Sequence, residues 1–399
     1  MEIDSDDKGY SGPDSGSFEM VAKTFRGLED VLAGEIESIG GQNIRKGTRV
    51  VFFSGTTELL YRANFQLRTA LRILKPFFEF RAKNEDELYK GASRFNWSSL
   101  LLENKTFAID GVLSSPYFNH SKYIALKVKD AVVDQFRAAT GMRPSVDTVD
   151  PDIRINLHIS EDKCTLLLDS SGESLHKRGY RSEASPAPLN EVLAAGMIML
   201  SGWDRKSPFI DPMCGSGTIP IEAAMMAHNI PPGIYRNQYA FEKWPDFDGE
   251  LFKKIFNEDY AEPVLSPSIT GSDISPRIIA MARKNAKNAF LNKKIDFTIS
   301  SFEEMFPAGE GGVLLFNPPY GERLKKDNIK AFYTLIGDIL KKNYAGYSAW
   351  MLTSNLEALK YTGLRTEKRV VLYNGPLECR FVKYTIYKGS RKNEFKKKY

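Results

Sequence analysis

The sequence has little of what a disulfide framework, a metal centre or a membrane span would need. Three cysteines, Cys164, Cys214 and Cys379, and four scattered histidines occur in 399 residues, and no CxxC pair is present. This usage excludes a disulfide scaffold and a zinc site. No run of 18 apolar residues occurs, so no transmembrane helix is expected. We therefore expect a protein of the reducing cytoplasm that holds no metal.

Charge is mild overall, at +5, and unevenly placed. Residues 1–17 are acidic, polar and glycine-rich, unlike a signal peptide, and are expected to form a disordered leader. Residues 389–399 are expected to form a basic tail. The end of the chain carries Lys388, Arg391, Lys392, Lys396, Lys397 and Lys398 against one acid, Glu394. Such a block is either solvated or attracts phosphate, if the rest of the chain points to nucleic acid.

Two small α+β units are predicted before residue 173. In residues 18–82, strand-like FEMVAKT and TRVVFFSG alternate with two helix-like segments, the first of which stops at Gly40-Gly41. In residues 83–172, a helix with an apolar face ends before Gly141. DIRINLHIS then alternates strictly, and a turn leads into CTLLLDSS. The polar face with Arg154 is either the solvent-exposed face of an antiparallel sheet or a surface that contacts RNA.

Residues 173–388 have a different pattern. Apolar runs without alternation recur at parallel-sheet intervals, separated by helices: SPFIDP, SITGSDI, KIDFTIS, GGVLLFNPP, YSAWMLTS and CRFVKYTIYKG. Continuous apolar strands indicate a sheet covered by helices on both faces. The pattern predicts a doubly wound α/β domain whose ligands bind at the carboxyl ends of the strands.

The first of these strands ends in DPMCGSGTIPIEAA, where Gly215 and Gly217 allow a tight turn before a helix that Thr218 opens. A phosphate-binding P-loop would need a lysine here, and a dinucleotide fingerprint would need a third glycine where Pro220 stands. A Gly-Ser-Gly turn without a phosphate to hold fits S-adenosylmethionine, although a plain glycine turn stays open from the glycines alone.

Later strands add to the same rim. Asp273 ends its strand, where a carboxylate can accept hydrogen bonds from both ribose hydroxyls of a nucleoside. It lies far beyond the usual spacing from the glycine turn, because an aromatic-rich, partly helical insertion, HNIPPGIYRNQYAFEKWPDFDGELFKKIF, precedes it. Ser301 and Phe302 follow the third strand and could flank an adenine. A helix N-cap is the alternative for Ser301.

The fourth strand ends in NPPYGERL. An exocyclic amine on an aromatic ring is a poor nucleophile, and two acceptors aimed at its hydrogens favour pyramidalising the nitrogen. The Asn317 side-chain oxygen and the Pro318 carbonyl would be those acceptors, because proline stiffens the loop. Tyr320 would stack on a base taken from a single strand or out of its helix. The combination predicts an amino methyltransferase.

Four phrases together resemble one family: IDPMCGSGTIPIEAA, YAFEKWPDFD, FNPPYGERL and LHKRGYRSEASPAPLNE are similar to those of RlmL-type 23S ribosomal RNA guanine-N2 methyltransferases, across about residues 18–388. The resemblance implies a Rossmann-like class I S-adenosylmethionine-dependent domain preceded by a ferredoxin-like and THUMP RNA-binding region. It implies a reaction pocket around Asn317, and Asp211 beside the cofactor. Asn190 stands where lysine is common, and Ser301 stands where an acid is common. The chain is expected to lack the second methyltransferase domain of some long relatives.

The predicted domains are residues 18–82 (ferredoxin-like), 83–172 (THUMP) and 173–388 (methyltransferase). The predicted catalytic residues are Asn317, Pro318, Pro319 and Tyr320. The predicted cofactor-binding residues are Asp211, Cys214, Gly215, Gly217, Thr218, Asp273, Ile274, Ser301 and Phe302.

The expected activity is methyl transfer to guanine N2 in 23S rRNA, as naked RNA or in a precursor particle. The alternatives are the same chemistry on transfer RNA, an N6-adenine or protein-glutamine methyltransferase, and a non-catalytic RNA-binding assembly factor. Function is grafted on a fold, so the fold alone does not choose among them.

Overall fold

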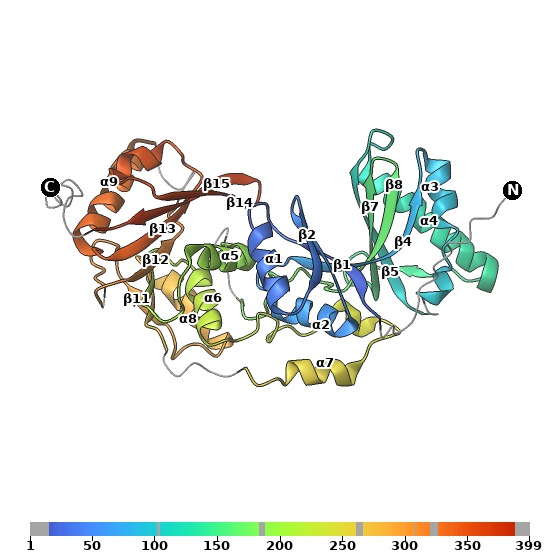
Figure 1. Cartoon of the computed structure of the whole chain (residues 1–399), viewed down its shortest axis with the longest axis horizontal. Helices are drawn as coiled ribbons and strands as arrows, with labels where there is room; N and C mark the ends of the chain where they lie inside the picture. Colours follow the sequence, from blue (N-terminus) through green and yellow to red (C-terminus); the bar gives the residue numbers. More distant parts are fainter. Residues whose placement is uncertain are drawn as a thin grey trace.

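The computed structural model describes residues 16–101, 104–182, 188–260, 266–307, 309–319 and 326–387, without the side chains of 326–328. Most of the expected leader, the expected basic tail and Tyr320 lie outside these residues. The molecule is elongated. The seven-stranded sheet of the C-terminal half forms one end of the molecule. Helices α3 and α4 lie at the other end, and the N-terminal unit with α1 and α2 lies between them (Figure 1). No helix in the described ranges is long and apolar enough to cross a bilayer.

The two strands and two helices predicted for the N-terminal unit form as β1, β3, α1 and α2, whereas β2 and β4 were not predicted. Its buried positions alternate along β3 and recur with helical spacing along α2. The elements are β1 (Phe18–Lys23), α1 (Glu29–Ser38), β2 (Gln42–Gly47), β3 (Val50–Gly55), α2 (Thr57–Gln66) and β4 (Arg72–Arg81).

The predicted helix and two strands of the second unit form as α4, β7 and β8, whereas α3, β5 and β6 were not predicted. Helix α4 ends at Gly141, which takes the left-handed conformation with a φ of 71°. Along β7 the isoleucine and leucine positions are buried and His158 and Ser160 are exposed, but the predicted strict alternation fails at Asn156, which is also buried. The elements are α3 (Glu85–Ala92), the 3₁₀ helix η1 (Trp97–Ser99), β5 (Thr106–Ser114), α4 (Ser121–Thr140), β6 (Ser145–Val146), β7 (Ile153–Ser160) and β8 (Lys163–Asp169).

These two units share one eight-stranded sheet, in the order β2-β3-β1-β4-β8-β7-β5-β6. The ten-residue strand β4 joins them, because it pairs with β1 near its start and with β8 over most of its length. A single hydrophobic core runs under both halves of the sheet. The sequence pattern showed two units but did not show that their strands pair.

The C-terminal half contains the seven-stranded sheet β11-β10-β9-β12-β13-β15-β14. One core packs α5, α6 and α8 against one face, and another packs α9 and η4 against the opposite face, as a doubly wound domain requires. The elements are α5 (Glu191–Ser201), β9 (Phe209–Asp211), α6 (Thr218–Ala227), η2 (Ala240–Lys243), α7 (Gly249–Phe256), β10 (Ile269–Asp273), α8 (Pro276–Asn288), β11 (Asp296–Ile299), β12 (Gly312–Phe316), α9 (Lys326–Asn343), β13 (Tyr347–Thr353), η4 (Ala358–Thr362), β14 (Lys368–Asn374) and β15 (Leu377–Thr385).

Two details of this sheet correct the sequence analysis. The run CRFVKYTIYKG forms β15, which is antiparallel to β13 and β14 and not part of the parallel series. Strand β14 was not predicted, because its exposed lysine, arginine and valine positions lack a continuous apolar run. Both differences arise because a hairpin completes the sheet without a crossover helix.

The aromatic insertion reaches from the catalytic half back to the N-terminal unit. Its α7 lies beneath α2 in Figure 1, and Phe241 of η2 is fully buried in the core of the eight-stranded sheet. The rings of Tyr61 and Phe241 stack with centroids 4.4 Å apart. The Tyr61 hydroxyl accepts a hydrogen bond of 3.0 Å from the backbone N–H of Asp248. The insertion therefore fixes the two halves of the molecule to one another.

Candidate active site

The strand order reverses between β9 and β12, since β10 and β11 follow on one side and β12 and β13 on the other. In a doubly wound sheet a ligand binds in the crevice that opens at such a point, beyond the carboxyl ends of the strands. A cavity of about 1170 Å³ lies at this position. It is lined by residues that follow β9, β10, β11 and β12, as the sequence analysis predicted.

Most of the predicted site residues line this cavity: Asp211, Cys214, Gly215, Thr218, Asp273, Ile274, Ser301, Phe302, Asn317, Pro318 and Pro319. Gly217 is not among the lining residues. Its φ is +87°, and an added Cβ would lie 3.1 Å from the Cβ of Ala282 and 3.2 Å from the ring of Phe297. Gly217 thus allows the tight turn and the close packing of α6 that follows it.

Asp211 ends β9 with a fully buried carboxylate. Its Oδ1 accepts a hydrogen bond of 3.1 Å from the N–H of Met213, whereas Oδ2 has no hydrogen-bond partner among the described residues. Burial raises the pKa of this carboxyl well above its ordinary range, and the negative charge of Asp273 raises the pKa further. A buried carboxylate without a partner is costly, so this oxygen indicates a place for a donor or a cation.

The glycine turn is held from below by Arg181, a residue that the sequence analysis did not single out. Its guanidinium donates to the hydroxyls of Ser216 and Thr218 at 3.0 and 2.8 Å, and to the carboxylate of Glu191 at 2.7 Å. Arg181 belongs to the phrase RGYRS, at the start of the predicted methyltransferase domain. Its two arginines were the sequence signal that could have indicated a charged contact to the glycine turn. Asn190 caps α5 instead of facing solvent, because its Oδ1 accepts from the N–H of Val192 at 2.9 Å.

Asp273 and its neighbours form the next part of the rim. The Asp273 Oδ1 accepts from the N–H of Ser275 at 2.9 Å, and the adjacent Ile274 side chain is 74% exposed. Phe302 is buried against Phe316, with ring centroids 5.8 Å apart. Ser301 does not cap a helix, because residues 302–304 form only a turn. A polar carboxylate beside two apolar surfaces suits a nucleoside, with its ribose on the acid and its base between the apolar groups.

Asn317 follows β12 on the other side of the reversal. Its Oδ1 is buried and has no hydrogen-bond partner in the described part of the chain. The peptide bond between Asn317 and Pro318 is trans. Asp211 Oδ2 and Asn317 Oδ1, both without a partner among the described residues, therefore line one cavity, where a ligand that donates to them would satisfy both.

Some cavity residues were missed. The turn Asn374-Gly375-Pro376-Leu377 between β14 and β15 lines the cavity, as do Phe332, Leu335 and Ile336 of α9. Asn-Gly-Pro between two β-rich segments is a turn signal that could have located the hairpin. Nothing in the sequence could have placed this turn over the carboxyl ends of distant strands.

The comparisons with known proteins agree with this geometry. The RMKL-like methyltransferase domain family matches residues 178–383, the THUMP domain family matches residues 82–169, and the RlmL ferredoxin-like domain family matches residues 19–74. The chain belongs to the RMKL-like methyltransferase family. The family is of the RlmK/L type, whose members are S-adenosylmethionine-dependent RNA methyltransferases. The predicted family, fold class and cofactor are therefore confirmed.

Individual relatives cover the chain well. A Synechocystis sp. protein, slr0064, named as a proposed RNA methyltransferase, is 37% identical over 94% of this chain and all of its own length. The ribosomal RNA large subunit methyltransferase K/L of Shewanella frigidimarina is 37% identical over 94% of this chain. This chain spans 54% of that protein, about half the length of the K/L relatives. The structure of SMU.472, titled as a proposed methyltransferase complexed with SAH, has a TM-score of 0.84 at 29% identity and covers 94% of this chain and all of its own.

Proposed function

We propose that the protein transfers a methyl group to the exocyclic N2 amine of a guanine in 23S ribosomal RNA. The observation that carries the proposal is the buried Oδ1 of Asn317, which has no partner among the described residues, at the reversal point of the RMKL-like domain. An amide oxygen in that position is an acceptor without a donor, and an exocyclic amine has hydrogens to donate. The shared sheet of the ferredoxin-like and THUMP units, and the ribosomal RNA names of the K/L relatives, support a large-subunit RNA substrate.

The residues of the rim would contact different parts of the cofactor. Asp273 would hold the ribose hydroxyls of the cofactor, Ile274 and Phe302 would flank its adenine, and Asp211 would offer its unpaired carboxylate. When bound, S-adenosylmethionine supplies a methyl group on a positively charged sulfur. The orphaned Asp211 oxygen and the apolar surfaces suit such a cationic nucleoside, so the residues present fit the group.

Asn317 and Pro318 would act on the target amine. Their two oxygens would accept its hydrogens and draw the nitrogen lone pair out of conjugation, toward the methyl donor. Pro318 and Pro319 would hold the carbonyl in place because proline fixes φ. No strong base is required, since the methylated amine is acidic and can lose its proton to water. Correct positioning of the amine would provide most of the rate enhancement.

The test is methyl transfer from labelled S-adenosylmethionine to unmodified 23S rRNA, followed by mass mapping of the RNA. We expect N2-methylguanine at one position. N6-methyladenine, or methylation of transfer RNA alone, would replace the proposed substrate with one of its alternatives. Absence of methylation of every RNA tested would refute it.

A substitution tests the catalytic role. Asn317→Ala should lower kcat by about 10²–10³-fold, as loss of one positioned hydrogen-bonding group does. The dissociation constants for RNA and cofactor should stay within about twofold. Asn84→Ala is the matched control, because Asn84 caps α3, accepting from the N–H of Glu87 and donating to its carboxylate, each at 2.9 Å, and lines neither cavity. It should cost about 1 kcal/mol of stability and leave kcat unchanged. Full activity of the Asn317 variant would exclude Asn317 from the chemistry.

A further inference from the structure

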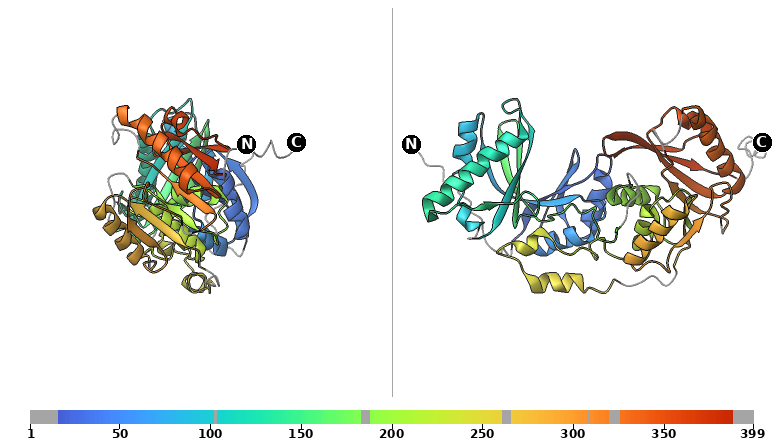
Figure 2. Two further views of the ribbon diagram at one scale, coloured as in Figure 1. Left: turned by 90° about the vertical axis from the view of Figure 1, so that its left-hand side faces the viewer. Right: turned by 180° about the vertical axis from the view of Figure 1, so that it is seen from behind.

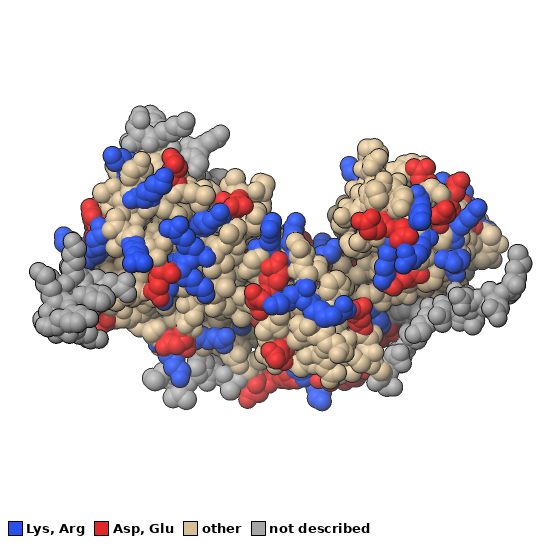
Figure 3. All heavy atoms as spheres, turned by 45° about the horizontal axis from the view of Figure 1, so that its top comes forward, with Lys and Arg blue, Asp and Glu red and all other residues tan. Residues whose placement is uncertain are grey.

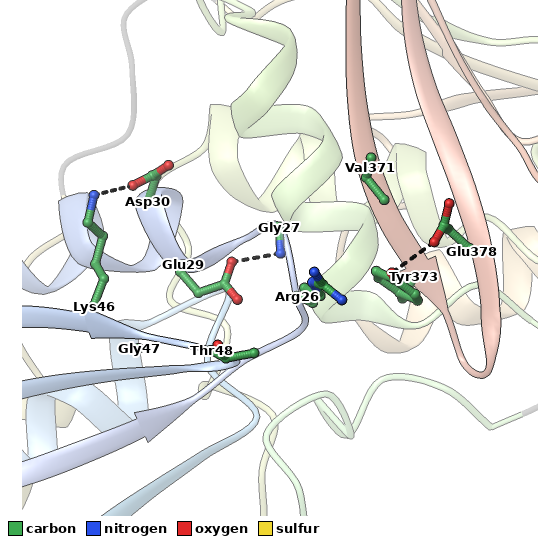
Figure 4. Close-up of a pocket in the computed structure, with 10 residues that line it drawn as sticks. All are labelled: Arg26, Gly27, Glu29, Asp30, Lys46, Gly47, Thr48, Val371, Tyr373 and Glu378. Carbon is green, nitrogen blue, oxygen red and sulfur yellow. Dashed lines mark hydrogen bonds and ion pairs between the residues drawn. The ribbon is translucent and has the colours of Figure 1, made fainter.

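A second cavity, of about 590 Å³, lies where the ferredoxin-like unit meets the β14–β15 hairpin of the catalytic domain. The first unit contributes the loop at Arg26, the start of α1 and the turn between β2 and β3. The hairpin contributes Val371, Tyr373 and Glu378 (Figure 4). Nothing in the activity proposed above uses these residues.

The two walls of this cavity are held in fixed positions. A Cβ on Gly27 would lie 2.4 Å from the carbonyl oxygen of Val371, so the loop and the hairpin touch through their backbones. The next residue, Leu28, is fully buried in the core of the catalytic domain against Gly196. The cavity is thus built into the joint and does not depend on loosely placed side chains.

Arg26 is available to a ligand, whereas the acids of the cavity are engaged. Glu29 accepts from the N–H of Gly27 at 2.7 Å, Asp30 pairs with Lys46 at 2.5 Å, and Glu378 accepts from the Tyr373 hydroxyl at 3.0 Å. Arg26 makes no ion pair or hydrogen bond with the described residues. Its guanidinium carbon lies 5.7 Å from the centre of the Tyr373 ring (Figure 4). The cavity therefore holds a cation beside an aromatic face, and the charge of Arg26 also lowers the pKa of the Glu378 carboxyl across the cavity.

The hairpin connects this cavity to the active site. Tyr373 lines the joint cavity, and the four residues that follow it, 374–377, line the cavity that contains Asn317. Figure 3 shows Lys and Arg side chains grouped on the catalytic half of the face onto which the central hollow opens, and mixed with acids on the other half. A polymer with one unit at Asn317 would have its neighbours close to the hairpin.

We propose that the joint cavity binds a nucleotide of the substrate RNA that neighbours the methylated base in the strand. Tyr373 would stack on its base, and Arg26 would pair with its phosphate. Stacking on an aromatic ring and neutralisation by arginine are the two contacts that hold single-stranded RNA without reading its sequence. This inference rests on the proposed RNA methyltransferase activity and adds to it a site that orients the strand.

The experiment measures RNA affinity and methyl transfer for full-length variants. Arg26→Glu should raise the dissociation constant and KM for a 23S rRNA fragment at least tenfold, with kcat and cofactor affinity unchanged. Arg26→Ala should reduce the slope of log affinity against log salt by about one. Tyr373→Ala should weaken RNA binding by about 5- to 100-fold, whereas Tyr373→Phe, which keeps the ring, should bind like the wild type.

Lys360→Glu is the matched control, because Lys360 is an exposed cation of η4 that pairs with Glu357 and lines neither cavity. It should bind RNA like the wild type, and melting temperatures should show that all variants are folded. RNA affinities of Arg26→Glu and Tyr373→Ala within twofold of wild type would overturn the proposal. If the wild type binds RNA through these residues but methylates none, the proposed function fails and the binding site stands. If it methylates RNA and the variants are neutral, only the binding site fails.

Discussion

Asp169 in the eight-stranded sheet and Asp211 in the catalytic sheet are both fully buried aspartates at the ends of strands, and their surroundings differ. Asp169 forms an ion pair with Arg72 and accepts from the N–H groups of Ser171 at 2.9 Å and Gly172 at 3.1 Å. Asp211 accepts one backbone hydrogen bond, and its only resolved charge influence is a second acid, Asp273.

The pKa of both carboxyls is raised, first of all by burial. At Asp169 a cation and two backbone hydrogen bonds oppose that rise, whereas at Asp211 one backbone hydrogen bond opposes it. Asp169 thus has its buried charge satisfied by groups of the eight-stranded sheet itself. The catalytic rim leaves the demand unmet, as it also does at Asn317. The difference teaches where to look for a ligand: at buried polar groups that the fold itself does not satisfy.

The largest predicted effect concerns the insertion that holds the two regions together. Phe241→Ala should cost about 3–5 kcal/mol of unfolding free energy, because its ring is fully buried between Tyr61 and Tyr239. Denaturant unfolding would measure the loss, and separate transitions for the two halves would show that the insertion couples them. Phe290→Ala, at a side chain 81% exposed, should change stability by less than about 0.5 kcal/mol. Equal stability of the two variants would contradict this role.

The next prediction makes the first aspartate resemble the second. Arg72→Met removes the cation beside Asp169 and leaves a buried carboxylate with backbone donors only. Loss of a buried partner costs about 3–5 kcal/mol. Arg72 keeps 28% of its side-chain exposure, so we expect about 2–3 kcal/mol at pH 7.

The pH dependence of this variant has a definite sign. The pKa of Asp169 should rise further, so the loss should shrink as the pH falls and Asp169 is protonated in the folded state. Arg81→Met is the control, because Arg81 is 75% exposed in its pair with Asp162. It should cost about 0–1 kcal/mol at any pH. A loss at Arg72 that is independent of pH would show that packing, and not the ion pair, is responsible.

Much of the candidate active site could be predicted from local sequence. The strand-turn-helix around Gly215 and the carboxylate at Asp273 were placed on one rim because apolar runs and turn residues report strand ends directly. Asn317 was placed there for the same reason. Apolar periodicity and turn residues are local features, because residues close together in the sequence determine them.

The remaining features depend on contacts distant in sequence. That β4 would serve two units, that Phe241 would enter a core some 180 residues earlier in the chain at Tyr61, and that the turn after Tyr373 would cover the active site all follow from tertiary packing. Strand β14 was missed because its outward positions are charged and its partner is antiparallel. Local propensity gives way to tertiary context in such edge hairpins.

The last prediction concerns Asp211 itself, whose substitution should change stability in the opposite direction. Because its folded-state pKa is raised, Asp211 costs no stability below the ordinary value of 3.8, and the cost grows as the pH rises from there through the folded-state pKa. Asp211→Asn should therefore stabilise the ligand-free protein at pH 7, and the gain should disappear as the pH falls toward 3.8. It should also weaken S-adenosylmethionine binding about tenfold, because the carboxylate that would face the cationic cofactor is gone.

Asp204→Asn provides the opposite case. Backbone N–H donors from Ser207 and Lys206 lower the pKa of Asp204, so loss of this carboxylate should destabilise the protein at pH 7. Thermal unfolding across pH and cofactor titration at pH 7 would measure both. A destabilised Asp211→Asn variant with unchanged cofactor affinity would mean that this carboxylate supports the fold and not the ligand.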